Sequence, residues 1–172
     1  MIDSLAIKYK PIDGHDLRYV IFTTGKIYDT QKGNFVATTM DTTATGYKKI
    51  NVELKTPEGA RRHCLVSRLL AEAFIPKVKG KKLIDHINRD SLDNNLKNLR
   101  WVNHSENRAN SKVQKNNKLG YKHLTLDDKG YYRVRVVRPN KTFCSSYKNI
   151  ETAIAVRNAY LDFINEPYDN LD

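Results

Sequence analysis

The N-terminal third of the chain shows the alternation of apolar and polar residues that is typical of strands. Residues 18–23 are rich in β-branched and aromatic side chains, and residues 46–54 alternate in the pattern of a half-buried strand. A turn at residues 24–26 precedes a return strand that reaches Tyr28, and a turn at residues 56–59 precedes another strand near residues 62–66. This part is therefore predicted to be β-rich.

The apolar spacing then changes to that of a helix. Leu65, Leu69 and Ala73 recur at intervals of four residues, and a second row is formed by Val66, Leu70 and Phe74. The spacing predicts a helix over residues 67–75, which Pro76 ends because proline lacks the backbone donor that a helix needs.

The apolar segments after Pro76 are short, and polar residues flank them on both sides. Leu83-Ile84 predicts a strand that runs into Asp85, and residues 99–102 predict a second strand after an Asn-rich loop. Asn103 with Glu106 three residues later has the spacing of a capping box, so a helix is expected to follow. Asn107 would then lie one turn into this helix and could face the two strands.

The C-terminal part repeats the strand pattern three times before a final helix. Strands are predicted over residues 121–126, 131–137 and 142–147, with turns at 127–130 and 138–141. A helix is predicted from about 149 to 164, with one apolar face formed by Ala153, Val156, Tyr160, Phe163 and Ile164. Within the second strand, Val134 and Val136 share one face and are expected to pack on that helix.

These elements predict an α+β fold in three parts. We expect a β-rich module that ends in a helix over residues 1–76, a ββα core with its linker over 77–118, and a sheet with one helix over 119–172. The length of 172 residues allows several small modules of this kind.

Basic residues are concentrated in the middle of the chain. Of 30 Lys and Arg against 19 Asp and Glu, residues 61–125 hold 15 against 5, whereas the segments on either side are nearly balanced. A concentrated positive charge predicts contact with a polyanion, although a solvated Lys-rich loop is the plainer alternative.

Other features exclude several classes of protein. The two cysteines, Cys64 and Cys144, are too few for a disulfide scaffold or a Cys-rich zinc site, although one disulfide stays open. No apolar run is long enough to span a membrane, and residues 1–5 do not show a secretion signal. We therefore expect a cytoplasmic protein without membrane contact.

The segment 83–110 resembles the nuclease motif of HNH homing endonucleases of the phage and intron-associated type. The resemblance is carried by Asp85-His86, Asn94-Asn95-Leu96, Asn98-Leu99-Arg100-Trp101-Val102 and Glu106-Asn107, in this order. It implies a ββα-metal core that hydrolyses phosphodiester bonds in double-stranded DNA and leaves 5′-phosphate and 3′-hydroxyl ends.

The resemblance also implies a role for each motif residue. His86 would be the general base, Asn98 would brace the loop, and Asp85 with Asn107 would hold a divalent cation, most simply Mg²⁺, with Mn²⁺ as an alternative. Neighbouring residues of a strand point to opposite faces, so Asp85 and His86 can reach one site only if the strand ends or bulges there. One motif per chain predicts a monomer that nicks DNA, unless two copies meet on the duplex.

The C-terminal part resembles the AP2 DNA-binding domain, on Gly120-Tyr121, Tyr132-Arg133-Val134-Arg135-Val136 and Thr152-Ala153-Ile154-Ala155. Arg133 and Arg135 would then face outward to read bases or hold phosphates, whereas the plainer alternative is a solvated sheet face. The residues expected to contact DNA are Arg68, Lys79, Lys81, Lys82, Arg100, Arg108, Lys122, Arg133, Arg135, Arg138 and Lys141.

Two other functions stay open at this point. The chain could be a catalytically silent protein that binds a DNA sequence with the same basic surface. It could also be an HNH nuclease without sequence preference, although two flanking modules would then have no evident use.

Overall fold

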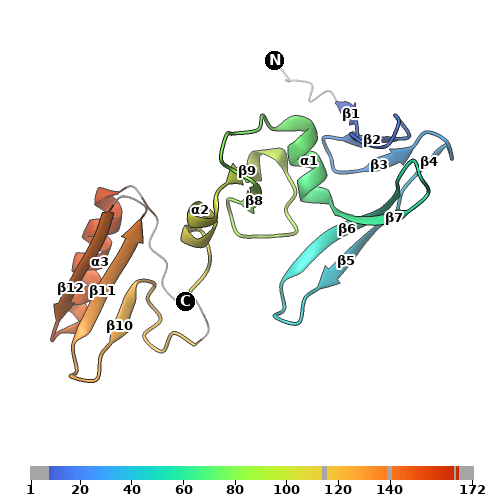
Figure 1. Cartoon of the computed structure of the whole chain (residues 1–172). Coiled ribbons are helices and arrows are strands. Elements are labelled where there is room, and N and C mark those ends of the chain that lie inside the picture. The colour runs from blue at the N-terminus through green and yellow to red at the C-terminus, as the bar shows by residue number, and fades with distance from the viewer. Residues whose placement is uncertain (1–7, 114–115, 139–140, 165, 167–172) are drawn as a thin grey trace, which may run out of the picture. The chain divides into compact units, whose positions relative to one another are not determined.

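The computed structural model describes residues 8–113, 116–138, 141–164 and 166, and the chain divides into two compact units at Asn110–Ser111 (Figure 1). Both units mix small antiparallel sheets with few helices. The expected mixture of α and β structure is therefore confirmed.

The first unit opens with two small sheets. The first sheet has the order β1-β2-β3-β4, with strands Tyr9–Pro11, Tyr19–Phe22, Ile27–Asp29 and Asn34–Phe35. The second has the order β5-β6-β7, with strands Thr38–Thr42, Lys48–Lys55 and Arg61–Leu65. The sequence did not predict β1, β4 and β5. Strand β5 is exposed along its whole length, so it has no alternation of apolar and polar positions to reveal it.

Helix α1 (Val66–Phe74) packs both sheets into one core. Its buried Val66, Leu69 and Leu70 belong to a cluster with residues of the first two sheets and with Leu99. The turn between β2 and β3 approaches this helix closely, since a Cβ on Gly25 would lie 3.4 Å from Val66 Cγ1. Glycine suits this turn because its φ is +81°.

The remaining part of the first unit is a short hairpin and a helix. Strand β8 (Leu83–His86) pairs with β9 (Leu99–Val102) in a two-stranded sheet, with a 3-10 turn at Leu96–Asn98 before β9 and helix α2 (His104–Ala109) after it (Figure 1). The predicted strand, loop, strand and helix of this segment are confirmed. Trp101 is 5% exposed and its Nε1 donates to the Ile75 carbonyl at 3.1 Å, so this side chain belongs to the core.

The second unit is a three-stranded sheet with one helix. Strands β10 (Leu124–Leu126), β11 (Tyr132–Arg138) and β12 (Lys141–Tyr147) are antiparallel, and α3 (Ile150–Phe163) packs against β11 and β12. Val134 and Val136 are fully buried, as predicted, and share a core with Leu124, Ala153 and Leu161. Of the predicted turn at 138–141, residues 139 and 140 lie outside the described residues.

The predicted apolar face of α3 is wrong in part. Phe163 is 72% exposed, and the buried face consists of Ala153, Arg157 and Leu161, at intervals of four residues. The arginine in the middle of this row conceals the pattern in the sequence. Its guanidinium lies 5.3 Å from the centre of the Tyr121 ring, a cation–π contact that offsets part of the cost of burying the charge.

Two further observations bear on the class of protein. Cys64 and Cys144 are free, so the disulfide that the sequence left open is absent from the described residues. Among the residues that the structure describes, no helix is long and apolar enough to cross a membrane.

His123 makes the stability of the second unit sensitive to acid. Burial, together with the charges of Arg138, Lys122 and Arg157, lowers the pKa of His123 from 6.5 to about 4. Because the unfolded chain binds this proton more readily, the free energy of unfolding should fall as the pH drops from 6.5 towards 4. Amide hydrogen exchange of β11, measured in the full chain across this range, should show the loss.

The control for this prediction is His123→Asn. His123 has a φ of +65°, which asparagine tolerates better than most residues. The variant should lose the part of the pH dependence that histidine contributes and keep the part that carboxylates contribute. Equal pH profiles in the variant and the parent would contradict the assignment.

Candidate functional site

The acid–histidine pair lies at the end of β8, where the apolar Leu83 and Ile84 give way to polar residues. Both side chains are 8% exposed. The pairing of β8 with β9 is regular through Asp85 opposite Arg100 and His86 opposite Leu99, so no bulge turns the two side chains to one face. They accordingly meet different partners.

The Asp85 carboxylate is held by two donors. Arg100 donates from Nε and Nη2 to Oδ2 at 2.9 and 2.7 Å, and Asn110 Nδ2 lies 3.0 Å from both carboxylate oxygens. A buried carboxylate needs such partners, because its desolvation would otherwise be costly. Arg100, which the sequence suggested as a DNA contact, thus forms an ion pair within the motif.

Asn110, the residue after helix α2, connects the end of this helix to the end of strand β8. Besides contacting Asp85, its Nδ2 lies 2.9 Å from the His86 carbonyl, and its Oδ1 accepts from Arg89 Nε at 3.4 Å. The sequence analysis missed this residue. Its only signal was its place in the polar run at the end of the predicted helix, three residues after Asn107.

His86 is oriented by the Asn-rich loop. Its Nε2 lies 3.0 Å from Asn94 Oδ1, and an amide oxygen can only accept, so Nε2 carries the hydrogen. In the neutral imidazole, Nδ1 is then the nitrogen with a free lone pair. Asn94 was noted in the sequence as part of the loop but not as a partner of the histidine.

Asn98 holds the two ends of that loop together. Its side chain accepts from the Asn88 backbone at 2.9 Å and donates to the Asp93 carbonyl at 2.8 Å. Its own carbonyl accepts from the Ile87 backbone at 2.8 Å. These bonds keep the loop, and with it Asn94, close to the end of β8.

Helix α2 begins with the expected capping box. The Asn103 side chain accepts from the Glu106 backbone, and the Glu106 carboxylate accepts from the Asn103 backbone. Lys81 forms an ion pair with Glu106 at 2.6 Å, which lowers the pKa of Glu106 together with the bond from Asn103. The cap fixes the start of the helix and therefore the position of Asn107 in its first turn.

The structure brings His86 and Asn107 to one hollow of about 210 Å³. Asp85 is not among the residues that line it. Residues of β6, β7, α1 and β8 and of two loops complete the wall. The lining residues are Tyr47, Lys49, Ile50, Leu65, Ser67, Arg68, Leu83, Ile84, His86, Ser91 and Asn107.

The donors present suit one hard cation. Among the described residues, no three of His, Cys, Asp and Glu lie close enough together to hold a metal. A single carboxylate and an amide are nevertheless enough for a Mg²⁺-like ion, which keeps several waters. Among the residues that the structure describes, Asp85 Oδ1 accepts only from Asn110, and the exposed Asn107 side chain has no hydrogen-bond partner. Asp85 and Asn107 are thus oxygen donors of the type that such an ion prefers, but Asp85 does not line the hollow that Asn107 lines.

Several residues predicted to contact DNA already have partners within the protein. Arg68 donates to Glu72 and to the Lys82 carbonyl, and Arg138 pairs with Glu166, which raises the pKa of Arg138. Lys122 donates to the Ser111 carbonyl, and Arg108 also has a partner. With Lys81 and Arg100, these side chains contribute to the fold as well as to the positive charge.

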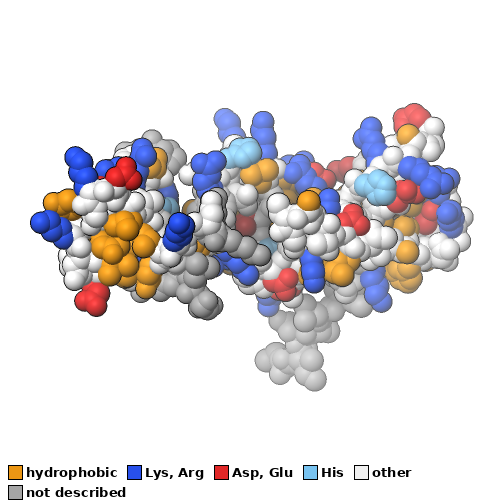
Figure 2. Space-filling model, turned by 90° about the horizontal axis from the view of Figure 1, so that it is seen from below, with side chains coloured by type: hydrophobic (Ala, Val, Ile, Leu, Met, Phe, Trp, Pro, Cys, Tyr) orange, Lys and Arg blue, Asp and Glu red, His pale blue; other side chains and the backbone are white. Residues whose placement is uncertain are grey.

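The other predicted contacts are more open. Lys79, Lys82 and Arg135 are exposed and have no side-chain partner among the described residues, Arg133 lies 3.6 Å from Asp127, and Lys141 lies over the Phe163 ring. On the face that Figure 2 shows, Lys and Arg side chains are spread over both units. The positive charge of the chain is thus available at the surface.

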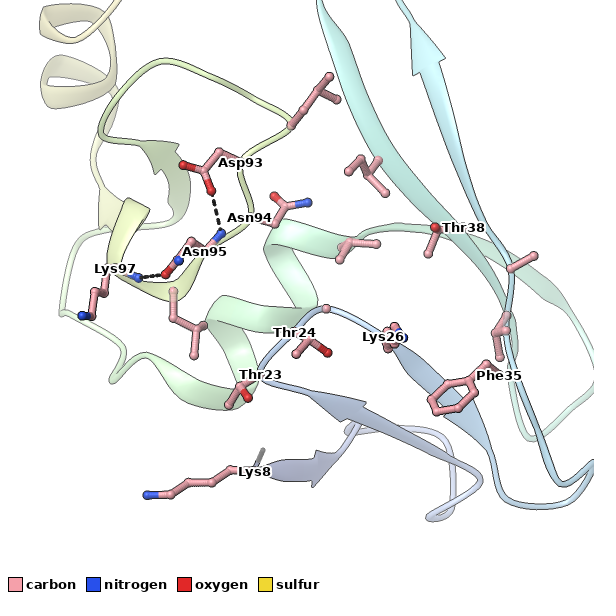
Figure 3. Close-up of a pocket in the computed structure, with 17 residues that line it drawn as sticks. Lys8, Thr23, Thr24, Lys26, Phe35, Thr38, Asp93, Asn94, Asn95 and Lys97 are labelled. Carbon is pink, nitrogen blue, oxygen red and sulfur yellow. Dashed lines mark hydrogen bonds between the residues drawn. The ribbon is translucent and has the colours of Figure 1, made fainter. Parts of the chain in front are cut away.

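A second and larger hollow of about 1190 Å³ is lined in part by the Asn-rich loop. Figure 3 shows Asp93, Asn94 and Asn95 from this loop, Thr23 and Thr24 from the β2–β3 turn, and Phe35 beyond them. Neither Asp85, His86 nor Asn107 lines it. This largely apolar hollow is therefore distinct from the one that the histidine lines, although Ile50 borders both.

Comparison with known proteins supports the interpretation of the motif. Residues 64–109 match the model of the HNH endonuclease family. An uncharacterized HNH endonuclease of Acanthamoeba polyphaga mimivirus is 28% identical over 99 residues, which are 56% of this chain and 23% of the relative. The chain thus spans about a quarter of the curated relative that it matches. The predicted resemblance to HNH endonucleases is confirmed for this segment.

A solved structure is similar over most of the chain. It is that of the HNH homing endonuclease I-HmuI, described as "DNA binding and cleavage", and it matches with a TM-score of 0.51 and 22% identity. The match covers 88% of this chain and 84% of the other. The likeness shows a shared fold.

Asn107 and Asn110 should differ sharply in their effect on stability. Asn110→Ala removes the donor to Asp85 and His86 and should lower the free energy of unfolding by about 1–3 kcal/mol. Asn107→Ala removes an exposed side chain without a partner and should change it by less than about 0.5 kcal/mol. Trp101 is the only tryptophan, so its fluorescence in a urea titration reports on the first unit. Equal losses in both variants would contradict the described geometry.

Proposed function

We propose that the chain is a metal-dependent endonuclease that hydrolyses phosphodiester bonds in double-stranded DNA, at a preferred site in the manner of homing enzymes. The observation that carries the proposal is the hollow shared by His86 and Asn107, within a segment that matches HNH endonucleases. The basic surface supports DNA as the substrate, since phosphate neutralisation supplies most of the affinity for a polyanion.

The chemistry assigns His86 the role of general base. With Nε2 donating to Asn94, its Nδ1 would take a proton from a water that attacks the phosphorus, a role typically worth 10²–10⁴-fold in rate. Asp85 and Asn107 would hold the divalent cation, Mg²⁺ or Mn²⁺, which when bound neutralises charge at the phosphate and stabilises the leaving oxygen. Asn98 would act by holding the loop that carries Asn94.

We further propose that the second unit is an AP2-like module that reads DNA sequence through β11. Its three strands and one helix support this, as do Arg133 and Arg135, which are exposed on one face of the strand whose other face is buried. Exposed arginines on a sheet can bind guanine through two hydrogen bonds or hold phosphates.

The first test is cleavage of the DNA that surrounds the gene for this chain, with Mg²⁺ and with chelator. His86→Ala should abolish cleavage and leave DNA affinity within a few-fold, because the base does not anchor the duplex. Single-turnover cleavage and a binding titration in chelator measure the two quantities separately.

The outcomes of this test distinguish three functions. If the parent binds this DNA but never cuts it, the chain is a silent DNA-binding protein. If it cuts unrelated duplexes equally well, the nuclease has no sequence preference. Cleavage by His86→Ala at the parent rate would remove the histidine from the mechanism, and full cleavage in chelator would remove the metal.

A second variant tests the role of β11. Replacing both Arg133 and Arg135 by Ala should reduce discrimination between target and random duplexes, with roughly 1–3 kcal/mol lost for each contact to a base. Binding titrations on both duplexes at several salt concentrations measure this. The charge-matched control replaces Lys112 and Lys118, both exposed, and should weaken binding to the two duplexes alike.

The salt dependence separates the two kinds of contact. Each phosphate contact that is lost should reduce the slope of affinity against salt by about 0.9, whereas a lost base contact should leave the slope unchanged. If the arginine variant keeps the full target preference, β11 does not read the sequence.

A further inference from the structure

One wall of the hollow that holds His86 comes from a sheet that the nuclease motif does not include. Tyr47, Lys49 and Leu65 line the hollow, and Leu65 lies opposite Asn51 in the pairing of β6 with β7. Alternate residues of a strand share a face, so Lys49 and Asn51 point to the same side, and Leu65 lies beside them. Lys49 is thus one of the residues that border the hollow, as is Ile50 beside it in β6.

Lys49 has no ion-pair partner among the described residues. The acid opposite it on β5 is Asp41, whose carboxylate instead accepts from Asn51 Nδ2. Lys49 is only half-buried, so its ammonium keeps some water, yet it adds a positive charge to a hollow that no acidic residue lines. An anion entering this hollow would meet that charge.

The place of Lys49 is fixed from both sides. Ser91, at the start of the Asn-rich loop, donates from Oγ to the Lys48 carbonyl at 2.6 Å. On the other side, β6 pairs with β7, which leads directly into α1. The wall that carries Lys49 is thus joined to the loop that orients His86.

We propose that Lys49 contacts the phosphate that is cut and stabilises the negative charge that develops on its oxygens. The proposal rests on the nuclease function proposed above and adds a residue that lies outside the segment matched by the family. An ammonium placed where charge develops is worth more in a confined site than in water, because less solvent must reorganise around it.

The step is an ordinary hydrolysis. A water oxygen forms a bond to phosphorus as its proton passes to His86 Nδ1, and the bond from phosphorus to the 3′ oxygen breaks, which leaves a 5′-phosphate and a 3′-hydroxyl after that oxygen is protonated. Lys49 forms and breaks no covalent bond. Its role is to balance the charge on the two non-bridging oxygens.

The neighbouring Lys48 provides a matched control. It carries the same charge one residue away, and it is not among the residues that line the hollow. The test compares Lys49→Met, Lys49→Arg and Lys48→Met in single-turnover cleavage at saturating DNA. Methionine keeps most of the aliphatic stem, so folding should be preserved, which Trp101 fluorescence can verify.

Lys49→Met should lower the cleavage rate at saturation by roughly 10²-fold, whereas Lys49→Arg should recover most of the rate and Lys48→Met should stay within about twofold of the parent. A DNA-binding titration under conditions that prevent cleavage complements this measurement. In chelator, Lys49→Met should bind an all-phosphate duplex more weakly than the parent does, but both should bind equally a duplex with a neutral methylphosphonate at the mapped cut.

Three results would overturn the role of Lys49 alone: Lys49→Met cutting at the parent rate, Lys48→Met losing as much as Lys49→Met, or a loss of affinity with no change in rate at saturation. A parent chain that binds DNA and never cuts it would instead overturn the nuclease function, and the role of Lys49 with it.

Discussion

The motif depends on one buried charge, the carboxylate of Asp85. At 8% exposure it requires partners, and Arg100 on the facing strand and Asn110 after helix α2 supply them. Removing one member of such a set leaves a charge that is costly to bury, so the strand, its neighbour and the helix are held in one arrangement. Because Asn110 also donates to the His86 carbonyl, this same network fixes the position of the His86 backbone.

Around that network, the remaining polar residues of the loop act mainly on one another. Asn98 holds the loop ends, and Asn94 accepts from His86 Nε2, so amides orient the proposed base without supplying charge. The capping box of α2 brings Asn107 to the same hollow from the other direction. The result is a site in which the reactive groups are few and most residues serve to orient them.

In the second unit, the arrangement of the small core decides which side chains are exposed. Its core is small, and a row of α3 that faces this core contains Arg157, placed over the Tyr121 ring. With Val134 and Val136 turned inward, Arg133 and Arg135 are left on the exposed face of β11. The packing of a minimal core thus determines which arginines are available to a ligand.

The residues by themselves determined the elements of the motif, the helix α1, the capping box at Asn103 and the concentration of positive charge, because each depends on local spacing or composition. They could not reveal β5, which is exposed throughout, or the buried face of α3, which an arginine interrupts. Only the tertiary structure separated Asn107, which lines the hollow, from Asn110, which supports Asp85, and brought Lys49 and His86 to the border of the same hollow. These relations join residues up to some forty positions apart through strand pairing and burial. The spacing of apolar and polar residues within one helix or strand cannot predict them.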